Sequence, residues 1–313
     1  MNTLLVAPSP HQKHPITTQR IMLCVLVSLL PAVIAGGYYF GLRAIYLVLL
    51  CTIGSVVMEG WCRLLMKRSQ TISDLSAAVT GMLLALNLPV TIPAWQALIG
   101  CFVAIVIVKQ LFGGRGQNFA TPAIVARIVL MLSFTSNMTT WVIPRYWKSD
   151  SDVITGATPL VTGTASYRDL LLGNTGGCIG ETCAIALIIG GVYLMIRRII
   201  SPSTPLAFIG TVALLNLIAG NDVVYQLLSG GLLLGAFFMA TDYVTTPITW
   251  KGKLVFGIGC GVMTFLIRQF GGYPEGVSFS ILLMNILTPY IDRFTMTHPL
   301  GAVKPAKEGK SHA

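Results

Sequence analysis

Charged residues are scarce in this chain. Only 10% of its 313 residues are Asp, Glu, Lys or Arg, whereas 54% are hydrophobic and the mean hydropathy is +0.75. A soluble globular domain carries about 25% charged residues, because its surface must be solvated by water. So low a charge content argues against an ordinary soluble domain and indicates that a lipid bilayer surrounds most of the surface.

The chain also lacks the local motifs of metal centres. Its seven cysteines form no C-x-x-C pair, and no Cys/His cluster has zinc or iron–sulfur spacing. Most of them lie in apolar runs, where a thiol behaves as a small buried hydrophobe, although Cys178 and Cys183 near a polar segment could pair. We therefore predict no metal ligands and leave open a site shared with another subunit.

Acidic residues are fewer than basic ones, which leaves a net charge of +10. In a soluble protein this balance would suggest nucleic acid as a partner. In an apolar chain it is better explained by basic cytoplasmic loops, so we expect no nucleic-acid binding. With a cytoplasmic N-terminus the basic residues collect on the inner side, which predicts that both termini are cytoplasmic and that the polar loop 141–181 lies outside.

Long apolar runs are abundant, and they do not alternate between apolar and polar residues as the strands of a membrane barrel do. Several approach the roughly 20 residues that a spanning helix needs. We predict an all-α integral membrane protein with about ten transmembrane helices. The runs are 21–41, 44–62, 74–88, 95–111, 120–140, 182–196, 205–220, 223–241, 254–270 and 276–292.

An internal repeat organises these runs. Phe112-Gly113-Gly114 recurs as Phe270-Gly271-Gly272, 158 residues later, and Pro89 and Pro247 are the same distance apart. Five spans per half would make the repeats inverted, an arrangement common in transporters. Runs 74–88 and 223–241 are short or interrupted in both halves, which indicates broken helices near a midplane site. We expect a first repeat in 1–140, an outer loop in 141–181 and a second repeat in 182–313.

A few polar residues lie at membrane depth. Glu59, Asp74, Arg127 and Asp242 fall inside or at the ends of apolar runs, where charges are rare and mark ion paths, ligand contacts or structural ion pairs. Each by itself is more easily explained as a structural pair or a snorkelling end group. Asp242 and Asn118 are the preferred ion- or flavin-lining candidates, because they flank the repeat-related breaks. We predict no catalytic side chain.

The outer loop contains the sequence Asp152-Val153-Ile154-Thr155-Gly156-Ala157-Thr158-Pro159. From the residues alone this is a turn, because glycine and proline punctuate it. A threonine hydroxyl is a weak nucleophile without a base, and no His or Lys lies nearby in the sequence. Thr158 is therefore a poor catalytic residue, although another enzyme could use it as an attachment point.

The pattern Asp-x-x-Thr-Gly-Ala-Thr resembles the flavinylation motif of bacterial flavin transferases, which join the phosphate of FMN to the last threonine. The rest of the chain resembles the NqrB/RnfD family of membrane subunits, found in the sodium-pumping NADH:quinone reductase and in the Rnf electron-transport complex. The absence of the longer N-terminal extension of the NqrB branch favours the RnfD branch. The matching segments are Ser73-Asp74, 80–89, Gly113-Gly114, Asn118, Pro122-Ala123, Gly176-Gly177, 179–182, 240–242, 245–247, 275–277 and 283–285.

The resemblance implies covalent FMN on Thr158, with Asp152, Thr155, Gly156 and Ala157 recognised by the transferase. It also implies a subunit of a bacterial inner-membrane complex that couples electron transfer between ferredoxin and NAD to sodium or proton movement. The expected partners are iron–sulfur subunits, a second FMN-carrying subunit, the flavin transferase and the lipid bilayer. Relatives also contain a noncovalent riboflavin. The resemblance does not identify the coupling ion.

Two other functions remain compatible with the predicted fold. A secondary transporter or channel without a redox cofactor would have the same inverted repeats and broken helices, because fold does not settle function. A structural membrane anchor for other subunits is the third possibility. The loop motif separates these alternatives, since neither a transporter nor an anchor needs a flavin attachment site.

Overall fold

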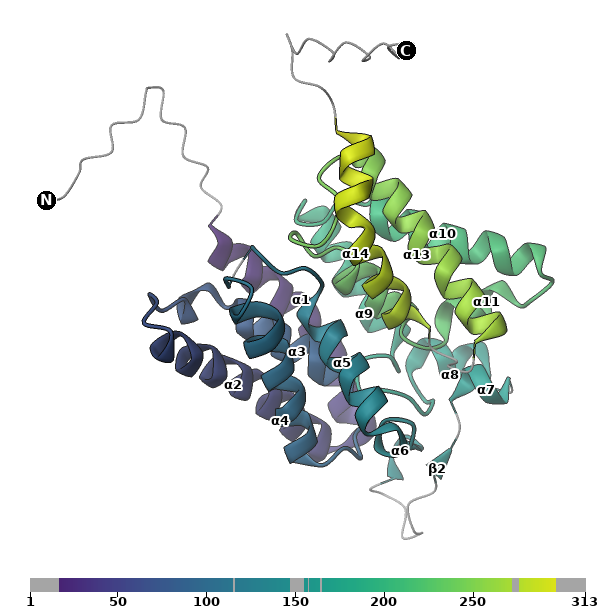
Figure 1. Ribbon diagram of the computed structural model, residues 1–313. Coiled ribbons are helices and arrows are strands. Elements are labelled where there is room, and N and C mark those ends of the chain that lie inside the picture. The colour runs from purple at the N-terminus through teal and green to yellow at the C-terminus, as the bar shows by residue number, and fades with distance from the viewer. Residues whose placement is uncertain are drawn as a thin grey trace, which may run out of the picture.

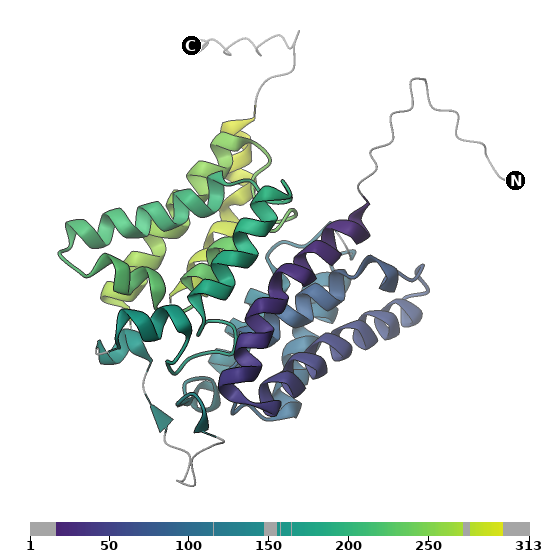
Figure 2. The ribbon, with the colours of Figure 1, turned by 180° about the vertical axis from the view of Figure 1, so that it is seen from behind.

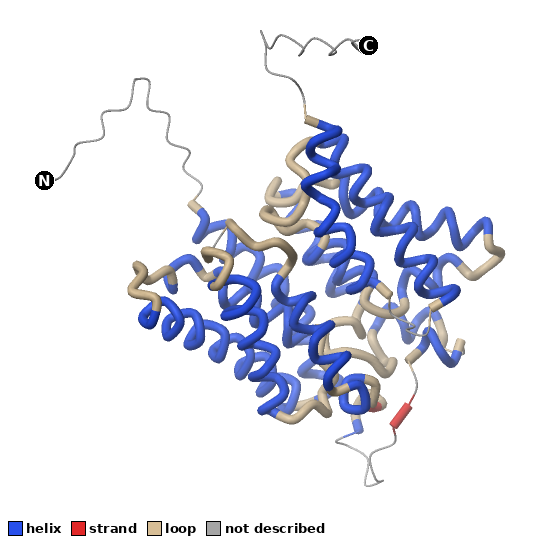
Figure 3. The backbone as a smooth tube through the Cα atoms, viewed as in Figure 1, coloured by secondary structure: helices blue, strands red, loops and turns tan. Residues whose placement is uncertain are grey.

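The computed structural model describes residues 17–114, 116–146, 155–156, 158–163, 165–271 and 276–296. Helices dominate these residues (Figure 3), which confirms the all-α fold class. The strands among them are β1 (Trp141–Val142) and β2 (Thr155–Gly156). They pair antiparallel, with Trp141 opposite Gly156, and so bring two parts of loop 141–181 together.

The first group of helices covers the predicted first repeat and appears in purple and blue in Figure 1. The α2 helix is followed by a short 3-10 turn, and α4 continues directly into a π-helical stretch. The elements are α1 (Thr18–Phe40), α2 (Leu42–Leu65), η1 (Ile72–Asp74), α3 (Ser76–Leu86), α4 (Ala94–Phe102), η2 (Val103–Gln110), α5 (Pro122–Ser133) and α6 (Thr135–Met138).

The second group runs from α9 to α14, appears in green and yellow, and follows two short helices of loop 141–181, α7 and α8. The third helix of this group is broken into the three pieces α11, α12 and η4, as the glycines at 230 and 231 predict. The elements are α7 (Pro159–Thr162), α8 (Tyr167–Leu172), α9 (Ala184–Ile196), α10 (Ser203–Ile218), α11 (Val223–Leu228), α12 (Leu232–Leu234), η4 (Gly235–Met239), α13 (Trp250–Phe270) and α14 (Val277–Thr295).

The two groups meet where α1 packs against α9, which Figure 2 shows from behind. A glycine makes this approach possible. A Cβ atom added at Gly190 would lie 2.2 Å from the backbone oxygen of Ser28. No side chain fits there, so the close packing of the groups depends on this position. The start of α1 and the end of α14 lie toward the same end of the molecule, opposite α6.

The outward surfaces of the long helices are apolar, as a lipid environment requires. By length and composition, three described helices could cross a membrane, namely α1, α2 and α13, and five further apolar helices have 10–17 residues. The exact number of spans and the inverted repeat stay predictions. Exposed side chains on these surfaces include Ile34, Ile53, Trp61, Leu214, Leu217 and Ile258.

Candidate functional site

Two short helices end close to each other inside the molecule. We call α3 the first half-helix and the continuous stretch of α12 and η4 the second half-helix. Asn87, directly after the first, lies with its Nδ2 3.7 Å from Sδ of Met239, the last residue of the second. The unpaired carbonyls at the C-terminal end of a helix carry a partial negative charge. Two such ends therefore meet here, and positive groups are favoured beside them.

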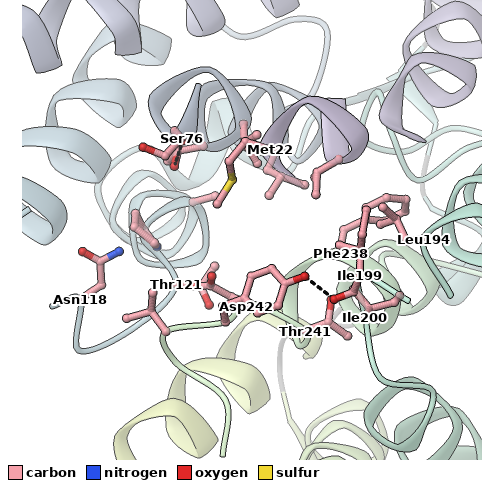
Figure 4. Close-up of a pocket in the computed structure, with 18 of the residues that line it drawn as sticks. Met22, Ser76, Asn118, Thr121, Leu194, Ile199, Ile200, Phe238, Thr241 and Asp242 are labelled. Atoms are coloured by element: carbon pink, nitrogen blue, oxygen red, sulfur yellow. Dashed lines mark hydrogen bonds between the residues drawn. The ribbon is translucent and has the colours of Figure 1, made fainter. Parts of the chain in front are cut away.

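A central cavity of about 100 Å³ lies beside the second half-helix (Figure 4). Asn118 and Asp242 both line it, so the structure brings together the two residues that the sequence singled out. In Figure 4, Asn118 and Thr121 lie at the left of the cavity, and Leu194 and Phe238 at the right. One wall is thus polar and the opposite wall apolar, a combination typical of small-molecule sites.

The arginine cluster follows the first half-helix and consists of Asn87, Arg127, Cys178, Glu181 and Ser278. The Arg127 guanidinium donates to Asn87 Oδ1 at 2.7 Å and Ser278 Oγ at 3.3 Å, and it pairs with Glu181 Oε1 at 3.0 Å. Cys178 Sγ accepts a further contact from Arg127 at 3.4 Å. All five side chains are buried, so the positive charge is compensated inside the protein.

The hydroxyl cluster follows the second half-helix and consists of Thr121, Asp242, Thr245 and Asn285. The hydroxyls of Thr121 and Thr245 are 3.1 Å apart, and Thr245 donates to Asp242 Oδ2 at 3.3 Å. Asn285 Nδ2 donates to Thr121 Oγ1 at 3.1 Å. This cluster contains one carboxylate and, unlike the arginine cluster, no cationic side chain.

A second buried ion pair joins α2 to η2. Lys109 Nζ lies 2.9 Å from Glu59 Oε1 and donates to Ser76 Oγ at 2.8 Å. Gln110 donates to the same carboxylate at 2.9 Å. The structural-pair interpretation of Glu59 and Arg127 is therefore confirmed. Sequence reasoning did not identify their partners, Lys109 and Glu181, although Glu181 falls in the matching segment 179–182. The sequence signal that could have identified these two partners is their position, because each is an ionisable residue at the end of an apolar run.

Thr158 precedes α7 and is only 4% exposed. It lines a narrow cleft of about 10 Å³, which holds no more than about one water molecule. The cleft is formed by loop 141–181 and by residues that follow α11. Its other lining residues are Pro159, Leu160, Leu170, Thr175, Gly176, Gly177, Glu181, Thr182, Leu228, Ser229 and Gly230.

The structure describes only part of the rest of the attachment motif. Asp152 and Ala157 lie outside the described residues, and Thr155 and Gly156 are described only by the backbone of β2. Thr158 itself is held near α11, because the Tyr225 hydroxyl donates to the Pro159 carbonyl at 2.6 Å. The last threonine of the motif thus lies in the cleft.

An exposed contact ties α8 to α11 beside this cleft. The Tyr167 hydroxyl donates to the Asp222 carboxylate, and this hydrogen bond, with that of the Tyr225 backbone N–H, lowers the pKa of Asp222 below its usual range. The same bond raises the pKa of Tyr167. Both side chains are solvated, so we expect only a small contribution to stability.

No group of three or more His, Cys, Asp and Glu residues that could hold a metal ion occurs in the part of the chain that the structure describes. Cys178 and Cys183 both carry free thiols. The pairing that the sequence left open for them is therefore absent, and Cys178 contacts Arg127 instead.

The sequence of the chain matches a known protein family and several of its members. Residues 5–301 match the model of the NQR2, RnfD, RnfE family. The chain is 48% identical to a subunit of the Na(+)-translocating ferredoxin:NAD(+) oxidoreductase complex of Acetobacterium woodii, over 98% of each chain. It is 40% identical to a subunit of the proton-translocating ferredoxin:NAD(+) oxidoreductase complex of Clostridium ljungdahlii, over 96% of this chain and 97% of that protein.

A more distant relative is a subunit of the ion-translocating oxidoreductase complex of Escherichia coli O127:H6. It is 34% identical over 95% of this chain and 98% of that protein. The match to the family model and these relatives extends over nearly the whole chain, including both half-helices and the Thr158 cleft. This chain therefore belongs to the NQR2, RnfD, RnfE family and is a multi-pass membrane protein.

Proposed function

We propose that this chain is the flavin-carrying membrane subunit of an ion pump driven by electron transfer between ferredoxin and NAD. The observation that carries the proposal is the motif that ends at Thr158, in a chain similar over nearly its full length to proteins named as subunits of Na(+)- or proton-translocating ferredoxin:NAD(+) oxidoreductase complexes. The other subunits would include iron–sulfur subunits and a second FMN-carrying subunit. The loop would face the outer side of a bacterial inner membrane, with both termini inside.

Thr158 would act as a tether, through an ester between its hydroxyl and the phosphate of FMN. When bound, the flavin supplies the redox chemistry, and the protein positions it. The cleft has a volume of about 10 Å³, which is too small for the ring and also for the phosphate of FMN. The ring of an attached FMN would therefore lie outside this cleft. A transferase would reach the buried hydroxyl only when the segment that begins at Thr158 leaves the cleft.

The central cavity is our proposed site for a noncovalent riboflavin, which would have to widen it, because its volume of about 100 Å³ is smaller than the roughly 300 Å³ of a small-molecule pocket. Its apolar wall, which includes Leu194 and Phe238, would pack against the flavin ring. Asn118 and Asp242 on the other side offer hydrogen-bonding groups that could fix the orientation of the ring or the ribityl chain. A flavin at this position would lie within the membrane region and not in the outer loop.

Flavin fluorescence of the denatured protein in a gel tests the attachment site. We expect fluorescence in the band of wild-type protein made together with its flavin transferase, and none in Thr158→Ala. Thr182→Ala is a matched control, because Thr182 lines the same cleft and also has a buried hydroxyl. Fluorescence that survives in Thr158→Ala, or that disappears equally in Thr182→Ala, would contradict the assignment.

A secondary transporter is the second candidate function, since the cavity between two broken helices suits it equally well. A wild-type protein without covalent flavin, despite an active transferase, would favour that function. A structural anchor for other subunits is distinguished by the phenotype of Thr158→Ala. Under our proposal this variant assembles with the other subunits but stops electron transfer. An assembled variant complex with unimpaired electron transfer would favour the anchor.

A further inference from the structure

The exposed side chains of α1 form an apolar stripe that ends at Tyr38. Its members follow one another at a spacing of three or four residues, which places them on one face of the helix. They are Leu23, Val27, Leu30, Ile34 and Tyr38, and all of them are exposed. Figure 2 shows α1 (purple) crossing the front of the molecule. Since α1 is long and apolar enough to cross a membrane, this α1 stripe is a surface that suits the acyl chains of lipids.

Arg145 lies at the end of the α1 stripe. Its backbone N–H donates to the carbonyl of Tyr39, in the last turn of α1, at 2.7 Å. Its guanidinium donates to the Tyr38 hydroxyl at 3.2 Å, and it lies 5.3 Å from the ring centroid of Tyr38 and 5.9 Å from that of Tyr39. Aromatic rings attract a cation at such distances. The positive charge is therefore held beside the last turn of α1, where tyrosines typically meet the membrane surface.

The backbone of Arg145 is left-handed, with φ of 63°. This conformation costs conformational energy in a residue other than glycine, and it persists only where the surrounding contacts fix it. Here the contacts are the backbone hydrogen bond to Tyr39 and the side-chain hydrogen bond to Tyr38. A ligand of the guanidinium would therefore find it largely in position, which lowers the entropy cost of binding.

The guanidinium of Arg145 keeps most of its hydrogen-bonding capacity. Among the residues that the structure describes, no carboxylate lies within ion-pair distance of it. The bond to Tyr38 uses one of its five N–H donors. The other donors form a planar fork that matches two oxygens of a phosphate. At the surface of a membrane, the headgroups of lipids supply such phosphates.

We propose that Arg145 and Tyr38 bind the phosphate of an anionic phospholipid whose acyl chain lies along the α1 stripe. The guanidinium would donate to two phosphate oxygens, and the Tyr38 hydroxyl, which accepts from Arg145, would donate its hydrogen to a third. A single unpaired positive charge favours a lipid with net negative charge, because the amine of a zwitterionic headgroup would be repelled by it. The site involves neither Thr158 nor the central cavity.

Native mass spectrometry of the purified full-length chain in a nonionic detergent tests this site. Titration with phosphatidylglycerol gives the Kd of the most tightly bound lipid. We expect the Kd to rise about tenfold in Arg145→Gln, which corresponds to about 1.4 kcal/mol, because the charged contact with the phosphate is lost. Arg145→Lys keeps the charge without the planar fork, so its Kd should fall between those of wild type and Arg145→Gln.

Tyr38→Leu provides a second variant in case Arg145→Gln does not fold. It keeps the α1 stripe apolar and retains Arg145, but it removes the hydroxyl and the ring that hold the guanidinium. Its Kd should also rise, while its melting temperature without added lipid stays close to that of wild type. A wild-type Kd in both Arg145→Gln and Tyr38→Leu would overturn the proposal.

Arg43→Gln is the matched control. Arg43 is an exposed arginine just after the end of α1, and its guanidinium donates to the Thr91 carbonyl at 3.0 Å. It would attract anionic lipids in a general way, but it makes no printed contact with Tyr38 or Tyr39. We expect the wild-type Kd in this variant. A loss equal to that of Arg145→Gln would indicate general charge attraction and contradict a specific site.

The choice of lipid separates a phospholipid site from other occupants. Phosphatidylcholine should bind more weakly than phosphatidylglycerol, and equal affinities would contradict the preference for an anionic lipid. Glycerol 3-phosphate has the phosphate without the acyl chains and should not displace phosphatidylglycerol. Displacement would indicate a site for small free anions and would overturn the proposal. The absence of saturable phosphatidylglycerol binding to wild type would also overturn it and would favour a partner subunit as the occupant of this surface.

Discussion

The arginine cluster and the hydroxyl cluster lie at the ends of the two half-helices, at positions that the predicted repeat makes equivalent, yet their side chains differ in charge and in hydrogen bonding. The first carries its own cation, because Arg127 reaches Asn87 and Glu181 with several donors at once. The second has short hydroxyl and amide side chains, one carboxylate and a surplus of acceptors. The first cluster has a paired charge and a structural role, whereas the second keeps acceptor oxygens without a partner among the described residues.

The planar guanidinium of Arg127 explains why the arginine cluster carries a charge that is paired on several sides. A guanidinium presents five N–H groups in a plane and is always charged. Asn87, Cys178, Glu181 and Ser278 surround it, so the charge has partners on several sides. Asn285, 158 residues later and thus at the equivalent position of the predicted repeat, is shorter and donates only to Thr121 in its own cluster.

The largest effect should come from Arg127→Met, which leaves the carboxylate of Glu181 buried without its partner. Breaking one side of a buried ion pair costs about 3–5 kcal/mol. We expect a corresponding loss in the free energy of unfolding, measured by denaturant titration of the purified protein. Arg127→Met with Glu181→Gln should recover much of the loss. A double variant as unstable as the single one would show that the ion pair is not the cause.

A smaller effect is expected from Gly190→Ala, which separates the two groups of helices that carry the clusters. Its new Cβ atom would meet the Ser28 carbonyl oxygen at 2.2 Å, and overpacking of this kind costs about 1–3 kcal/mol. Gly210→Ala in α10 is the control, because a Cβ atom there meets nothing within 4 Å. Thermal unfolding should distinguish them, and an equal melting temperature for both would contradict the close contact.

The smallest effect should follow from Thr245→Val, which removes one hydroxyl from the hydroxyl cluster and leaves no unpaired cation. A single hydrogen bond contributes about 0.5–1.5 kcal/mol net. We expect a loss of that size in denaturant titration, well below that of Arg127→Met. A loss as large as that of Arg127→Met would remove the distinction between the ion-paired arginine cluster and the hydrogen-bonded hydroxyl cluster.

Some of the candidate site follows from the sequence. Asn118 and Asp242 stand out because they flank breaks in the predicted repeat, and both line the central cavity. No site role follows from the sequence for Thr121, Thr245 and Asn285, because a lone threonine or asparagine carries no local signal of its contacts. Lys109 escapes sequence reasoning for a similar reason, since its partner Glu59 is 50 residues away in the sequence.

Thr158 marks a different limit of sequence reasoning. The motif names the residue, but nothing in the local sequence predicts that its side chain is 4% exposed. Its burial depends on residues that follow α11, including Ser229 and Gly230, which line the same cleft. Accessibility is a property of the folded chain, and it determines when a transferase could reach the hydroxyl.

The sequence by itself determined that a lipid bilayer surrounds this protein and that its fold is all-α. The reason is that charge content and the length of apolar runs depend on composition and residue order alone. The tertiary structure decided which buried charges pair and which acceptors stay unpartnered. These properties arise from contacts between residues far apart in the chain, such as Asn285 with Thr121 and Arg127 with Glu181. The physical reason is that buried polar groups are stable only with partners, and only folding brings the partners together.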